Sequence, residues 1–182
     1  LVKLGVVLQG IKCVQTFKVT RDKIPVYTVD ASYMIDATTG YVRISSFGAT
    51  THDEFKRHCE GLFAKGMKDL VIDLQGNGGG YLQSAVQLSD EFLGNCEIIV
   101  YPEGRATGRQ EYHAHSGKMD LGKVVILVDG YTASAAEILS GAIQDNVRGI
   151  IVGRRTFAKV LVQRPIDLPD GSMIRLTFSH YY

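Results

Sequence analysis

The feature that most constrains the fold is an alternation of short apolar runs with amphipathic helical patterns. Residues 70–74 (LVIDL) form a nearly continuous apolar run, which is followed by the glycines GNGGG and by a helical pattern over residues 82–93. The same succession recurs where residues 123–130 (KVVILVDG) lead into a helical pattern over residues 135–142. This alternation favours an α/β domain with a largely parallel sheet, and the continuous apolar runs are typical of strands covered on both faces.

A strand and a helix are also predicted upstream of this region. Residues 41–47 (YVRISSF) alternate as a β-strand does, and the following THDEF indicates the start of a helix. Thr51 is the predicted N-cap, and Glu54 three residues later would complete a capping box. Gly66 would end this helix. The acidic residues Glu54 and Glu60, together with Asp53, are predicted to form a solvated face.

The two ends of the chain carry further strand patterns. Residues 160–163 and 173–178 predict a β-hairpin that turns at Pro169-Asp170-Gly171. Residues 1–29 contain two short alternating runs and a charged connector, RDKIP. Two strands alone cannot bury a core, so this segment is expected to be separate from the main domain.

Composition excludes several classes of protein. The chain has 182 residues, of which 45% are apolar and 21% charged, and its net charge is +1. This length and composition fit one globular domain, and mixed charges give no basic face for nucleic acid or anionic membrane. Apolar runs such as 124–128 are far too short to span a bilayer. Cys13, Cys59 and Cys96 are widely spaced and suggest neither disulfides nor zinc. The start at Leu1, without a signal-peptide pattern, suggests a fragment.

Ser134 is the first candidate for chemistry. It falls where a buried strand ends and a helix begins, a position at which a hydroxyl can be exposed above the sheet edge. The amides of a helix N-terminus also favour developing negative charge, which suits a nucleophile. The alternative is that Thr132 or Ser134 serves only as the N-cap of the helix.

Lys159 is the second candidate, because it interrupts the apolar alternation of FAKVLVQ, residues 157–163. A buried lysine favours its neutral form, and a neutral amine beside Ser134 could remove the proton of the hydroxyl as it attacks a carbonyl. The alternative is an ordinary solvated lysine on a strand.

The glycines and histidines give weaker signals. GNGGG at residues 76–80 is either a tight turn or a nest of amide donors for an oxyanion, and it matches no phosphate loop, because Tyr81 takes the place of the last glycine of GxGxxG. His113 and His115 could share a metal, but no third ligand is evident. His180 could act as a base, although nothing orients it. No metal or cofactor is expected.

Taken together, these segments resemble the carboxyl-terminal processing, or tail-specific, protease family of serine peptidases. The family's core motifs are matched in order and spacing by GYVRISSF, TTHDEF, GMKDLVIDLQGNGGGYL, TASAAEILSGAIQDN, VGRRTFAKVLVQ and DGSMIRLTFSHYY. The resemblance implies an α/β core similar to the Clp-protease and crotonase architecture, with βαβ units and a C-terminal β-hairpin.

The resemblance also implies roles for particular residues. It implies Ser134 as the nucleophile, Lys159 as its general base and Gln163 as the residue that positions the lysine. It further implies an oxyanion hole built from the backbone amides of Ala135 and of Gly79 or Gly80. Such an enzyme would cut protein substrates near the C-terminus through an acyl-enzyme, without metal or cofactor.

Domain organisation and partners follow from the same resemblance. Residues 1–29 look like the last strands of a truncated PDZ domain with its linker, and residues 30–182 like a protease core that is incomplete at its C-terminus. Implied partners are proteins or peptides with an accessible C-terminus, with no nucleic acid, no required membrane association, and a possible homo-oligomer. The implied location is the bacterial periplasm or cell envelope.

Three departures from the family pattern support an alternative function. Where the family has FGKG, this chain has Ala158 and Val160 beside the lysine; Gln75 replaces the usual Arg, and Val147 replaces Asp or Gly. The larger side chains could close the substrate groove. The alternative is therefore an inactive homologue that binds a peptide or hydrophobic ligand, and a third hypothesis is a scaffold whose first strands pair between copies.

Overall fold

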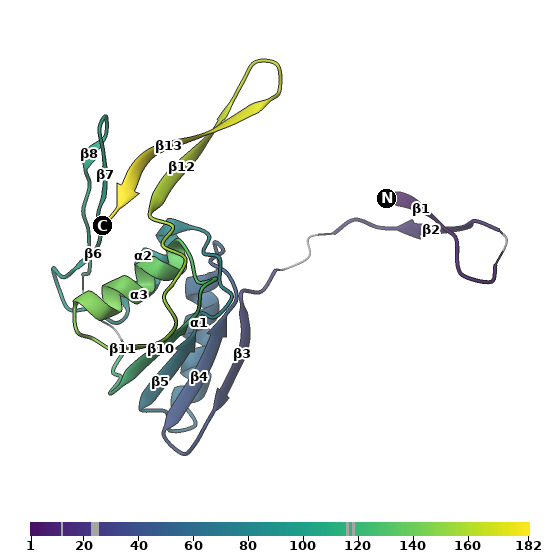
Figure 1. Ribbon diagram of the computed structural model, residues 1–182. Helices are drawn as coiled ribbons and strands as arrows, with labels where there is room; N and C mark the ends of the chain where they lie inside the picture. Colours follow the sequence, from purple (N-terminus) through teal and green to yellow (C-terminus); the bar gives the residue numbers. More distant parts are fainter. Residues whose placement is uncertain (12, 23–25, 116, 118) are drawn as a thin grey trace.

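A computed structural model describes residues 1–11, 13–22, 26–115, 117 and 119–182 (Figure 1). The elements follow in the order β1 (Val2–Val6), β2 (Gln15–Val19), β3 (Val29–Met34), β4 (Thr39–Ile44), α1 (Thr51–Phe63), β5 (Asp69–Asp73), α2 (Leu82–Asp90), β6 (Ile98–Val100), β7 (Pro102–Gly104), β8 (Gly108–Arg109), β9 (Tyr112–His113), β10 (Val124–Val128), α3 (Ala135–Asp145), β11 (Ile150–Gly153), β12 (Leu161–Asp167) and β13 (Met173–Tyr181).

The central sheet has the strand order β11-β10-β5-β4-β3. Strands β4, β5, β10 and β11 run parallel, and β3 pairs with β4 antiparallel at one edge. In chain order, β5, β10 and β11 are each added beside the preceding strand on the same side of the sheet, as expected for successive crossover units. The predicted α/β class with a largely parallel sheet is confirmed, whereas the antiparallel strand β3 was not predicted.

One face of this sheet carries the main core. On β5, Leu70 and Ile72 are fully buried, and on β10 Val124 and Ile126 are buried as well, while their neighbours alternate with partial exposure. Helix α2 packs between α1 and α3, so the helices form one layer. The prediction that LVIDL is covered on both faces is therefore wrong. Successive side chains of a strand point to opposite faces, and Val71 lies on the less covered face of the sheet.

The beginning of α1 differs from its prediction. Thr50, not Thr51, is the N-cap, and Thr51 is the first helical residue. Glu54 is only 3% exposed, so the prediction of a solvated side chain is wrong. Its carboxylate accepts hydrogen bonds from the amides of Thr28 (2.7 Å) and Val29 (3.2 Å) and from the Thr50 hydroxyl (2.7 Å). Burial would raise the pKa of this carboxyl, but the hydrogen bonds outweigh it and lower the pKa.

A smaller layer of strands lies beside the helices. Strands β12 and β13 form the predicted hairpin, and the turn at Gly171 has a φ of 82°. The hairpin joins β7 and β8 in the order β12-β13-β7-β8, and β6 pairs with β9. The short strands β7, β8 and β9 lie in the polar stretch 102–122, where the sequence pattern did not predict strands. Tertiary pairing with β13 explains β7, since its own sequence, PEG, has no strand preference.

Strands β1 and β2 form an antiparallel ribbon of their own, which stands away from the core in Figure 1. Their residues are exposed or half-buried. The assignment of residues 1–29 to a PDZ domain stays a prediction. Cys13 and Cys96 are exposed and Cys59 is buried, all as free thiols. Within the described residues, no helix has the length and apolarity needed to cross a membrane.

Candidate active site

The candidate nucleophile lies where β10 ends and α3 begins. Ser134 has φ 57° and ψ −117° and occupies the N-cap position of α3. A positive φ in a residue other than glycine costs about 1–2 kcal/mol, so the fold holds Ser134 in a strained conformation. Thr132 does not cap the helix, because its hydroxyl donates to the Leu74 carbonyl (2.9 Å) and accepts from the Asp129 amide (2.9 Å).

The glycine loop packs directly against Ser134. Gly79 has a φ of 93°, and a Cβ at this position would lie 2.5 Å from the Ala133 carbonyl oxygen and 2.7 Å from the Ser134 Cβ. Gly80 likewise leaves no room for a Cβ beside the backbone of Phe47. The loop therefore needs both glycines to approach Ser134 and the backbone of Phe47.

The amides of the loop differ in availability. The Gly79 amide donates to the Asn77 side chain (2.8 Å), and Asn77 is fully buried. In the described part of the chain, the amides of Gly80 and Ala135 have no hydrogen-bond acceptor. Ala135 directly follows Ser134, and Gly80 lines a cavity together with Ser134, so both amides are candidate donors for an anionic oxygen in that cavity.

Asp129 connects the glycine loop to the loop that leads into Ser134. Its carboxylate accepts hydrogen bonds from the amides of Gly76 (3.1 Å), Tyr131 (2.9 Å) and Thr132 (3.1 Å). The bond from Gly76 contributes most to lowering the pKa of this carboxyl, and it outweighs the opposing effect of burial. Both loops thus depend on one ionised side chain.

Glu137 is a functional candidate that the sequence interpretation missed. One carboxylate oxygen accepts hydrogen bonds from the Ser134 amide (2.8 Å) and the Lys159 amide (2.9 Å). The other accepts from the Thr156 hydroxyl (2.7 Å) and the Ala158 amide (2.6 Å). Glu137 thereby holds the lysine segment against the start of α3. The spacing S-A-A-E from Ser134 is that of a capping box, and this signal could have revealed it.

Lys159 lies beside Ser134 but does not bond to it. Both residues line the same two cavities, yet the Lys159 side chain is exposed, and no hydrogen bond between the amine and Ser134 occurs among the residues described. Gln163 is exposed and donates to the Thr177 hydroxyl (3.2 Å). It lines one of these cavities together with Ser134 and Lys159. The three predicted residues are brought together around one cavity without a direct contact.

Two cavities meet at Ser134. One, of about 380 Å³, runs along α3 and has mainly apolar walls that include Ile138, Ala142 and Val160. The other, of about 480 Å³, extends toward Gly80 and Gln163 and is lined also by Arg175. If a peptide were bound across Ser134, a side chain on one side of Ser134 would therefore enter the apolar cavity. The peptide would continue on the other side along the more polar cavity.

Two departures from the family pattern have a backbone consequence. Ala158 has a φ of 63° and Val147 a φ of 53°, a region that favours glycine. Val147 follows the C-cap of α3: its amide bonds to the Gln144 carbonyl, and that of Arg148 bonds to Ile143, which is the Schellman arrangement. These positions explain the glycine that the family has at position 158 and the Asp or Gly that it has at position 147.

The histidines stay apart from this site. His113 contacts Glu111 (2.8 Å), whereas His115 lies 3.4 Å from Asp90, so the two imidazoles contact different carboxylates. His180 is exposed on β13. Within the described residues, no group of three or more His, Cys, Asp or Glu side chains is placed to hold a metal ion.

Comparison with known proteins places this site in a class. The structure matches the photosystem II D1 C-terminal processing protease with a TM-score of 0.74 and 30% identity over 93% of this chain and 47% of that one. The chain is 37% identical to a carboxyl-terminal-processing protease of Picosynechococcus sp. over 92% of its length, and 34% identical to the carboxy-terminal processing protease CtpA of Bacillus subtilis over 90%. It spans 41% and 35% of those two relatives.

The fold is the Clp-protease-like α/β fold of the C-terminal processing proteases. Residues 38–182 match the family model of peptidase family S41. The chain belongs to peptidase family S41, and the predicted family is confirmed. Relatives named as chloroplastic occur alongside the bacterial ones, so similarity does not favour a bacterial source.

Proposed function

We propose that this chain forms the catalytic core of a serine endopeptidase that cleaves protein substrates near the C-terminus with a Ser134–Lys159 dyad. The observation that carries the proposal is the grouping of Ser134, Gly80 and Lys159 around one cavity, with the amide of Ala135 directly after Ser134 in the chain. Membership in a peptidase family supports the reaction class.

In the proposed mechanism, the Lys159 amine accepts the proton of the Ser134 hydroxyl while its oxygen attacks the peptide carbonyl. The amides of Gly80 and Ala135 donate to the resulting oxyanion; Gly79 is less suited, because its amide already donates to Asn77. The protonated Lys159 then donates its proton to the leaving amine as the C–N bond breaks. Water, deprotonated by the same amine, hydrolyses the acyl-enzyme and restores both side chains.

The mechanism requires a rearrangement of the lysine segment. Lys159 is exposed, and its backbone amide donates to Glu137. A substrate chain that covers the cavity would exclude water from the amine and favour its neutral form. Gln163, across the cavity, is proposed to orient the amine once the substrate is bound.

The proposal is tested by mass spectrometry of an unfolded protein that has an apolar C-terminal segment. Cleavage is expected near the C-terminus, with a rate that falls on acidification because a protonated amine cannot act as a base. Ser134→Ala and Lys159→Ala should each reduce the rate about a thousandfold or more. Full activity in either variant, with the fold retained, would contradict the dyad.

The apolar cavity offers a second test. Gly141 lines it, and a Cβ at this position would meet no atom within 4 Å. Gly141→Leu should therefore fill the pocket without disturbing α3 and shift cleavage toward smaller residues before the scissile bond. Gly61→Leu is the matched control, because Gly61 also lies in a helix with open space around it but lines no cavity near Ser134.

Partners and location are further parts of the proposal. Substrates are proteins or peptides with an accessible C-terminus, and the site of action is an exported compartment, such as the periplasm or cell envelope. We further propose that β1 and β2 belong to a PDZ domain. A homo-oligomer is also proposed, and sedimentation at several protein concentrations tests it. The similarity to processing peptidases does not favour the alternative hypothesis, an inactive homologue that only binds a peptide or hydrophobic ligand.

A further inference from the structure

A further cavity lies at the edge of the sheet opposite to Ser134. It has a volume of about 760 Å³. Met67 and Lys68 precede β5, and Gly122 precedes β10, so the cavity lies at the amino ends of the parallel strands. Ser134 follows the carboxyl end of β10. The two sites are therefore separated by the length of the sheet, and a ligand in one does not touch the other.

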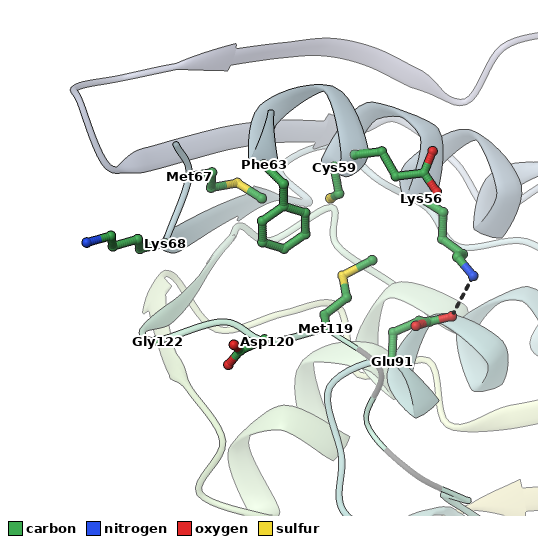
Figure 2. Close-up of a pocket in the computed structure, with 10 residues that line it drawn as sticks. Lys56, Cys59, Phe63, Met67, Lys68, Glu91, Met119, Asp120 and Gly122 are labelled. Atoms are coloured by element: carbon green, nitrogen blue, oxygen red, sulfur yellow. Dashed lines mark ion pairs between the residues drawn. The ribbon is translucent and has the colours of Figure 1, made fainter. Parts of the chain in front are cut away.

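One part of the cavity wall is apolar. Phe63 and Met119 point toward each other across it, and Met67 lies close by (Figure 2). The buried thiol of Cys59 closes the α1 side. Burial, and then the negative charge of Glu91, raises the pKa of this thiol to about 12, so Cys59 is an unreactive part of the wall. Such walls favour an aromatic or aliphatic body.

Glu91 is the buried carboxylate of the cavity wall. It is 3% exposed, and its Oε1 accepts from His52 Nε2 (2.8 Å) and lies 3.6 Å from Lys56 Nζ (Figure 2). Its Oε2 is buried and has no hydrogen-bond partner among the described residues. A buried carboxylate oxygen without a donor is costly. Because Glu91 lines the cavity, a rotation of its carboxylate would bring Oε2 to a donor bound there.

We propose that this cavity binds a primary ammonium group carried on an aromatic or aliphatic body. The ammonium would donate to Glu91 Oε2, and the body would lie between Phe63, Met67 and Met119. The charges favour a cation, because Glu60, Glu91 and Asp120 outnumber Lys56 and Lys68 around the cavity. Binding here does not depend on the proposed peptidase activity.

The test uses 2-phenylethylamine as the probe and the methyl groups of methionine as reporters. The chain has four methionines, so a spectrum of protein labelled at these methyl carbons is simple to assign. Titration should shift the Met67 and Met119 signals saturably and leave those of Met34 and Met173, which do not line the cavity, in place. Neutral 2-phenylethanol and anionic phenylacetate should bind at least about tenfold more weakly.

Variants separate the charge from the cavity. Glu91→Gln should weaken 2-phenylethylamine about tenfold, whereas Glu60→Gln, an equal change on an exposed residue of the same rim, should alter the affinity less than about threefold. If Glu91→Gln fails to fold, Met119→Trp, which fills the cavity from a loop, should abolish the shift of Met67. Absence of a saturable shift, equal binding of the alcohol, or unchanged binding in Met119→Trp would overturn the proposal.

Discussion

The two halves of the candidate active site are held in place by different means. Around Ser134, the residues Thr132, Ala133 and Ala135 are buried, and Gly79 packs against them with no room for a further atom. Around Lys159, the segment from Phe157 to Val160 is exposed, and the carboxylate of Glu137 joins it to the core. Ser134 is thus fixed by packing, whereas the lysine segment is held by hydrogen bonds: its amides at Ala158 and Lys159 donate to Glu137, and backbone bonds join its two ends to Thr132 and Tyr181. Substitutions in the first half should affect stability, and those in the second should affect activity.

The largest effect is expected for Gly79→Ala. Its Cβ would overlap Ala133 and Ser134, and alanine is unfavourable at a φ of 93°. The free energy of unfolding should fall by about 3 kcal/mol in urea denaturation, and cleavage should be lost. Gly78→Ala is the control, since Gly78 has open space around it, and it should change stability by less than about 0.5 kcal/mol. Equal effects of the two would refute close packing at Ser134.

Glu137→Gln should affect activity more than stability. The amide nitrogen of glutamine would replace an oxygen that accepts two hydrogen bonds. In the orientation that replaces Oε2, this NH₂ donor would face the amide donors of Ser134 and Lys159. Cleavage should fall about a hundredfold, while unfolding becomes easier by about 1–2 kcal/mol. Glu103→Gln, on an exposed strand residue, should change neither. A fully active, folded Glu137→Gln would show that the lysine segment is held by other contacts.

The strained positions Val147 and Ala158 allow a crossed test of the same contrast. Val147→Gly, at the end of α3, should stabilise the protein by about 1 kcal/mol without changing the cleavage rate, because it relieves a positive φ in a β-branched residue. Ala158→Gly should alter stability by less than about 0.5 kcal/mol but raise the cleavage rate by up to about tenfold, because the lysine segment gains freedom to reach Ser134. Denaturation curves and cleavage rates of both variants test this prediction. If Val147→Gly changed the cleavage rate and Ala158→Gly changed the stability, the difference proposed between the two halves of the site would be wrong.

The smallest effect concerns Asp129 and pH. Its pKa is lowered in the folded state, chiefly by the Gly76 amide, so its contribution to stability is complete above the ordinary carboxyl pKa of about 3.9. This contribution is lost as pH falls through the lower, folded-state pKa. Thermal unfolding of Asp129→Asn should therefore approach that of the parent protein as the pH drops below about 4. A constant offset between Asp129→Asn and the parent protein at every pH would contradict the assignment.

Sequence reasoning predicted much of the fold, but not all of the site. The runs at β5 and β10 identify parallel strands because a continuous apolar segment between helical patterns has few other solutions. The same runs misled us about burial, since only pairing and helix placement decide which face of a strand is covered. Strands β3 and β7 were missed because their sequences have weak strand preference and are held by neighbouring strands.

The amino-acid sequence was enough to identify the family and the candidate residues Ser134, Lys159 and Gln163. These are properties of local motifs, whose spacing is written along the chain. Only the tertiary structure shows that the Gly79 amide donates to Asn77, that Glu137 joins Ser134 to the lysine segment, and that a buried oxygen of Glu91 has no partner among the described residues. Each of these depends on which hydrogen-bonding groups meet in space, and such meetings are set by packing between segments far apart in sequence.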